Sequence, residues 1–211
     1  MSTPSNAIPE TRPLYWSVRR ELWENRWIYT APLAVAGIML FGFLIATIGR
    51  AMSTVDPVRR AAVLAEPTSF AAGLIMATAF IVGVFYSLEA LHSERRDRSI
   101  LFWKSLPVSD LTTVLSKVSI PIVILPLLTF AIILASQMIM AVLSTLVVLG
   151  SGLSVAALWT RLSLFQTSLM LLYHLLTVHT LWHAPIYGWL LLVSGWARRA
   201  VLLWEIGRAH V

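Results

Sequence analysis

The chain contains no cysteine. This absence excludes disulfide bonds, thiolate nucleophiles and cysteine-ligated metal or iron–sulfur centres within it. No Asp or Glu occurs between Leu111 and Trp204, so nearly half of the chain lacks a carboxylate for acid–base catalysis, a proton relay or cation binding. The chain also has no phosphate-binding loop of the Gly-x-x-x-x-Gly-Lys-Ser/Thr type, so any ATP hydrolysis would belong to a partner. We expect no catalytic residue, cofactor or metal.

Charged residues are scarce as well. They make up 12% of the 211 residues, against about 25% in soluble domains, whereas 58% of the residues are hydrophobic. Such a chain has too few polar groups to cover a globule, which indicates an integral membrane protein. The net charge of +6 comes from basic residues that cluster beside apolar runs, a pattern typical of membrane orientation, so we expect no nucleic-acid partner.

Four apolar runs are long enough to cross a bilayer. They cover about 28–48, 70–91, 118–148 and 168–195. The sequence therefore predicts an all-α polytopic fold in the lipid bilayer, preceded by a disordered segment over 1–12 that is rich in Pro, Ser and Asn. The last two runs exceed about 20 residues, so these helices must tilt, bend or extend beyond the bilayer. Pro121 and Pro126 can bend the third helix, and Pro185 can bend or break the fourth.

The stretch from Pro13 to Trp27 is basic and aromatic. It carries two apolar stripes at helical spacing, the first formed by Trp16, Trp23 and Trp27 and the second by Leu14, Val18 and Leu22, with charged residues between them. This pattern predicts an interfacial helix that lies along the membrane. Because the two stripes are separated, a short soluble helix is the alternative.

The distribution of Lys and Arg predicts the orientation. Most of them lie in the amino-terminal region, after the second run and after the fourth run, whereas the opposite side carries Arg50, Arg59, Arg60 and Arg161. The positive-inside rule therefore places the amino terminus in the cytoplasm. We expect a multi-pass protein of the cell membrane, either an inner or a plasma membrane.

The segment between the second and third apolar runs contains residues that typically begin and end helices. Ser93 can cap a short helix, Leu106-Pro107 can end it, and Ser109 with Asp110 can cap the next helix. Basic residues would hold this short helix at the membrane surface while its apolar residues face a soluble partner. The alternative is a solvated loop whose arginines only set the topology.

This segment also resembles a known family. The residues Glu94-Arg95 to Asp97, then Ile100-Leu-Phe-Trp-Lys-Ser-Leu-Pro-Val-Ser-Asp110 and Leu115-Ser-Lys117, are similar to the loop between the second and third spans of ABC-2-type permeases. The amino-terminal helix and the stretch Trp182-His-Ala-Pro-Ile-Tyr-Gly-Trp-Leu-Leu-Leu-Val-Ser194 with Trp196-Ala-Arg-Arg199 resemble the family too.

The resemblance implies a function. In that family the loop carries a coupling helix that docks on a separate ABC ATPase subunit, and two permease subunits, identical or different, assemble with two ATPases into an exporter. Residues 13–204 would be the permease transmembrane domain, and residues 93–117 its cytoplasmic coupling segment. Within the segment we assign Phe102, Trp103 and Leu106 as apolar contacts to the ATPase, and Arg95, Arg96 and Arg98 as its charged contacts. The full set of expected coupling residues is Glu94, Arg95, Arg96, Asp97, Arg98, Ile100, Leu101, Phe102, Trp103, Lys104, Ser105, Leu106, Pro107, Ser109 and Asp110.

The chain departs from the family in its number of spans, because such permeases usually have six. Its tail from Glu205 to Val211 can be back-translated into a DNA sequence that resembles a common sequencing adapter. We therefore expect 205–211 to be a non-native tail of a truncated reading frame, with two further spans lost.

A few polar residues inside the apolar runs remain to be assigned. Ser136 and Gln137, near the middle of the third run, are candidates for a substrate path or for a contact between helices. His174, His179 and His183 lack the spacing of a metal site, so a histidine-dependent membrane enzyme is a weaker alternative. A membrane scaffold or assembly protein that presents the same docking loop, without transport, is the other alternative.

Overall fold

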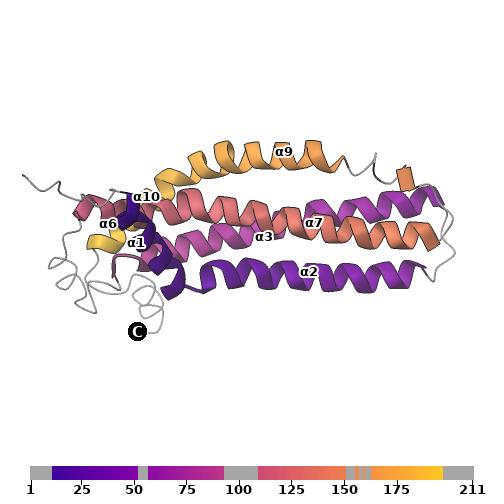
Figure 1. Ribbon diagram of the computed structural model, residues 1–211, viewed down its shortest axis with the longest axis horizontal. Coiled ribbons are helices and arrows are strands. Elements are labelled where there is room, and N and C mark those ends of the chain that lie inside the picture. Colours follow the sequence, from indigo (N-terminus) through magenta and orange to yellow (C-terminus); the bar gives the residue numbers. More distant parts are fainter. Residues whose placement is uncertain are drawn as a thin grey trace, which may run out of the picture. The chain divides into compact units, whose positions relative to one another are not determined.

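The computed structural model describes residues 11–51, 57–92, 109–150, 155–156, 159 and 163–196. The elements, drawn in Figure 1, are α1 (Thr11–Glu24), α2 (Trp27–Ala51), α3 (Pro57–Glu89), α6 (Asp110–Ser119), the π-helical turn η1 (Ile120–Ile124), α7 (Leu125–Gly150), α9 (Leu164–His174), the π-helical turn η2 (Leu175–His179) and α10 (Thr180–Trp196). All elements in these ranges are helical, so the predicted all-α class is confirmed for them.

Three helices are long and apolar enough to cross a membrane. Their apolar stretches are Trp27–Thr47, Ser69–Glu89 and Leu111–Gly150, and they coincide with the first three predicted runs. This length and composition identify a membrane protein. The fourth predicted span falls on α9, η2 and α10, which are 11, 5 and 17 residues long, and it stays a prediction.

Two compact units make up the chain. Unit 1 comprises the described parts of Met1–Arg26, Gly83–Ile124 and His183–Val211, and unit 2 comprises those of Trp27–Val82 and Leu125–Trp182. Unit 1 contains α1 and α6, which pack against each other, and unit 2 contains α2 and α7, which do the same. Each unit is considered by itself below.

Unit 2 is a bundle of apolar helices. In one cluster Ala36 of α2 packs with Ile132 and Ile133 of α7, and in a second cluster Phe43 packs with Met140 and Ala141. Because the residue numbers rise together on both helices, α2 and α7 run parallel. Residues of α3 join both clusters, namely Ala71, Ala72 and Ile75.

Buried hydroxyl groups in the bundle bond to their own helix. Thr47, Thr129 and Ser136 each donate to the backbone carbonyl four residues earlier, over 2.7 to 2.8 Å. This arrangement satisfies polar groups that could not bond to water inside a bilayer. The bundle is therefore suited to a lipid environment.

The predictions made for Pro121 and Pro185 have different outcomes. Pro121 lies in η1, where the backbone bonding changes from the α to the π pattern, so the helix is locally altered at the expected place. In contrast, α10 continues from Thr180 to Trp196 with Pro185 inside it. The predicted break at Pro185 is therefore wrong, whereas a bend there stays a prediction.

One predicted helix boundary needs correction, and another agrees with the structure. The amino-terminal helix ends at Glu24 rather than at Trp27, which is the first residue of α2. Asn25 closes the end of α1, because its backbone N–H and its side-chain Nδ2 both donate to the carbonyl of Glu21, at 2.9 and 3.2 Å. The helix that leads into the third predicted run begins at Asp110, directly after Ser109, as the predicted cap implies.

Candidate functional site

Ser109 begins the helix that follows the predicted coupling segment. Its backbone is extended, and its side chain accepts a hydrogen bond from the backbone N–H of Thr112 at 3.2 Å, which is the geometry of an N-cap. The predicted role of Ser109 as a cap is confirmed, and Asp110 is the first residue of α6. Glu94 to Pro107, which hold all the other predicted coupling residues, lie outside the described part of the chain.

A buried ion pair joins α6 to α1. Lys117 Nζ donates to Glu21 Oε1 at 2.7 Å, and Tyr86 Oη, from α3, donates to Glu21 Oε2 at 2.9 Å. The three residues are 3%, 7% and 1% exposed. We call Glu21, Tyr86 and Lys117 the Glu21 cluster, and all of it belongs to unit 1.

The energetics of the cluster make it sensitive to any single change. Removing two charges from water costs several kcal/mol per ion, which is offset only when the geometry is good and the remaining lone pairs are bonded. Here both carboxylate oxygens of Glu21 have a donor. Loss of one partner would leave a charge buried and unpaired, so the cluster fixes how α1 sits on α6.

The sequence prediction missed this cluster. The sequence pattern places Glu21 among the charged residues between the two apolar stripes and Lys117 at the end of the coupling segment, but it assigns neither of them a buried partner. One available clue was that Glu21 lies three and seven residues after Val18 and Leu14, within the second apolar stripe of the helix. A charge inside an apolar stripe calls for a buried partner.

A second set of contacts lies just before residue 93, at the other end of the segment that carries the predicted coupling residues. The backbone N–H groups of Leu91 and His92 donate to Ser194 Oγ of α10, at 3.2 and 3.0 Å. Ser194 is fully buried. The chain is thus held just before residue 93 by Ser194, and just after residue 108 by the Ser109 cap and the Glu21 cluster.

Close packing reinforces this region of unit 1. Gly83 of α3 lies against Tyr187 of α10, so that a Cβ built on Gly83 would come 2.8 Å from Tyr187 Oη. Gly73 of the same helix, in contrast, has nothing within 4 Å of its Cβ position. The lack of a side chain at Gly83 therefore permits a close approach of α3 and α10.

The candidate substrate-path residues lie in unit 2. Ser136 and Gln137 are 4% and 5% exposed. Ser136 Oγ donates to the carbonyl of Ile132 at 2.8 Å, and Gln137 Oε1 has no hydrogen-bond donor among the described residues. Both residues face the interior of the bundle, and their role in a substrate path stays a prediction.

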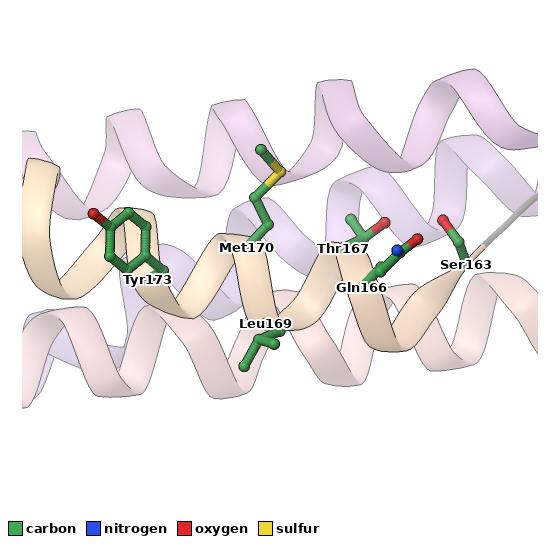
Figure 2. A pocket seen from close by; sticks show the side chains of 6 residues that line it. All are labelled: Ser163, Gln166, Thr167, Leu169, Met170 and Tyr173. Carbon is green, nitrogen blue, oxygen red and sulfur yellow. The ribbon is translucent and has the colours of Figure 1, made fainter.

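Two hollows occur in the described part of unit 2. The larger, of about 650 Å³, runs along α9 and is lined by Ser163, Gln166, Thr167, Leu169, Met170 and Tyr173. Figure 2 shows Ser163, Gln166 and Thr167 close together at one end of this row, and Tyr173 at the other end. The smaller, of about 170 Å³, is lined by apolar residues of α2 and α3 and by Met140 of α7. Both hollows offer mainly apolar surface, although four of the six residues that line the larger one carry a polar group.

The three predicted histidines do not converge on a metal. His179 is buried, His183 is half-buried and His174 is exposed. Within the described ranges, no group of three His, Asp or Glu side chains is arranged to hold a metal ion. The His183 ring instead lies 6.1 Å from the ring of Tyr187.

No family model, no curated protein and no solved structure matches the chain. The resemblance to ABC-2-type permeases therefore contributes only to the proposal that follows.

Proposed function

We propose that the chain is the membrane-spanning permease subunit of an ATP-driven ABC exporter, in which a separate ATPase subunit docks on the coupling segment, residues 93–117. The observation that carries the proposal is that both ends of this segment are held by buried polar contacts, since Ser194 binds the chain just before residue 93 and Glu21 binds Lys117 at the other end. A solvated loop that only set topology would need neither contact.

Through the two ends of the coupling segment, a movement of the ATPase would be transmitted to the membrane helices. Displacement of residues 93–108 would act on α6, which continues through η1 into α7, and on the end of α3. Through the Glu21–Lys117 pair it would also act on α1. Interfaces of this kind respond as rigid bodies rather than by gradual deformation.

The other parts of the proposal concern membrane placement and assembly. α1 lies at the membrane interface and the amino terminus is cytoplasmic, as the basic residues favour. A second permease subunit, identical or different, completes the translocation path, to which Ser136 and Gln137 contribute. The mostly apolar hollows would suit an apolar substrate better than a polar one.

The test begins at the native locus, where we expect a neighbouring gene to encode a phosphate-loop ATPase. The product of that gene should co-purify with the full chain. Changing Phe102 and Trp103 to Ala should abolish co-purification, because it removes most of the apolar contact area. A matched control changes Phe165 and Trp182, which are 82% and 78% exposed in unit 2, to Ala and should leave binding intact. Equal co-purification of both double variants would contradict the proposal.

A membrane scaffold that presents the same segment is the second candidate, because held flanks would serve it equally well. It would bind the partner through Phe102 and Trp103 but would show no nucleotide-dependent transport in proteoliposomes. Transport that requires ATP would exclude it.

A further inference from the structure

α1 carries an exposed face with a distinctive arrangement of aromatic and basic side chains. Tyr15, Trp16 and Trp23 are 60%, 59% and 68% exposed. The Arg19 guanidinium carbon lies 5.2 Å from the ring centroid of Trp16 and 5.6 Å from that of Trp23. Both distances are within the range of cation–π interactions, so the two rings hold the guanidinium between them.

This face is opposite the one that packs on α6. At 3.6 residues per turn, Trp16, Arg19 and Trp23 fall on one side of α1, and Glu21 falls roughly opposite them. Glu21 is buried against Lys117. The two stripes of the helix therefore have different surroundings, since one contacts protein and the other is exposed.

The position of the exposed face in the chain indicates what covers it. Only Asn25 and Arg26 separate α1 from α2, and α2 is one of the helices long enough to span a bilayer. If α2 spans, the carboxyl end of α1, which carries Trp23, lies at the level of the lipid headgroups, where tryptophan is enriched. This step rests on the membrane assignment of the proposed function and not on coupling to an ATPase.

The charges on the face favour an anionic headgroup. Arg20 pairs with Glu24, whereas Arg19 and Arg26 pair with no carboxylate in the described part of the chain. Arg26, which lies in the short link between α1 and α2, is exposed as well. A guanidinium binds phosphate through two parallel hydrogen bonds, and the rings beside Arg19 fix its position beforehand.

We propose that Trp16, Arg19 and Trp23 form a binding site for the phosphate of an anionic phospholipid, with the two indole rings at headgroup level. The site would hold α1 on the membrane surface while the opposite face of the helix contacts α6. A zwitterionic lipid would bind less tightly, because its own cation competes with Arg19 for the phosphate.

The test measures lipid binding to the purified full chain by native mass spectrometry, with titration of phosphatidylglycerol and, separately, phosphatidylcholine. Arg19→Gln should weaken phosphatidylglycerol binding by about fivefold, as expected for one basic residue near an anionic surface. Arg20→Gln is the matched control, with the same loss of charge at the next residue, and should change it little. Changing Trp16 and Trp23 to Leu keeps every charge and should also weaken binding.

Any of the following results would overturn the proposal. Equal losses in Arg19→Gln and Arg20→Gln would show diffuse charge attraction, and no loss in the tryptophan variant would show that the rings do not form the site. Competition by soluble glycerol phosphate at similar concentration would assign the site to free phosphate. If Arg19→Gln instead reduces ATPase co-purification with unchanged lipid binding, the face docks a protein. None of these results would affect the Phe102 and Trp103 test.

Discussion

At the scale of single residues, the buried carboxylate of Glu21 brings together two side chains from distant parts of the chain, those of Tyr86 and Lys117. Lys117 and Glu21 are 96 positions apart in the chain, yet each is the charge partner that the other needs in a buried site. Tyr86 bonds the second carboxylate oxygen and completes the set. A charge pair of this kind specifies one arrangement of α1 on α6, because a shifted arrangement would leave both ions without a partner.

Replacing Lys117 with Met should lower the free energy of unfolding by about 3–5 kcal/mol, because it leaves Glu21 buried without its counter-ion. Unfolding in mixed detergent micelles provides the measurement. Arg20→Met, which breaks the exposed pair with Glu24, should cost less than about 1 kcal/mol. The double variant Glu21→Leu with Lys117→Met should regain most of the loss, because no charge then remains buried. Similar values for Lys117→Met and Arg20→Met would contradict the assigned role.

At the scale of elements, the surroundings of α1 explain why its sequence carries two separate apolar stripes. The expectation of a helix with two apolar stripes was correct, but no partner for either stripe within the protein could be predicted from the sequence. In the structure the stripe that contains Leu14 and Val18 shares its side with Glu21, while the stripe with Trp16 and Trp23 is exposed. A helix that packs on protein and also meets another environment needs two apolar stripes rather than one.

The close contact of α3 with α10 leads to a prediction at this scale. Gly83→Ala should lower the free energy of unfolding by about 1–3 kcal/mol, because the new methyl group would overlap the ring of Tyr187, whose Cε1 and Cζ lie 2.9 Å from the Cβ position. Gly73→Ala is the matched control in the same helix, with open space around it. It should be neutral or stabilise by up to about 1 kcal/mol through helix propensity. A thermal shift assay of both variants checks this, and equal behaviour would refute the close contact.

The sequence predicted local features well and long-range features poorly. Apolar runs and the Ser109 cap depend on neighbouring residues, so they could be predicted from spacing. The π-helical turns η1 and η2 and the continuation of α10 through Pro185 depend on how a helix bonds internally and packs. The Glu21 cluster depends on three segments coming together, and a single sequence carries no direct signal for such a meeting.

At the scale of the whole molecule, the described residues form two compact units with different characters. Unit 2 holds the apolar bundle with its hollows, and unit 1 holds the buried polar contacts that flank residues 93–108. Under the proposed function, unit 1 would receive the mechanical input and unit 2 would contain the path across the membrane. An ATPase partner would then be essential to the function of the chain.

The most direct measurement of this claim is the rate of ATP hydrolysis by the neighbouring-gene ATPase in proteoliposomes, with and without the full chain. We predict that the chain changes the rate, that the Phe102 and Trp103 double alanine variant removes the change, and that Lys117→Met weakens it while binding is retained. A hydrolysis rate that is the same with and without the chain would contradict the account.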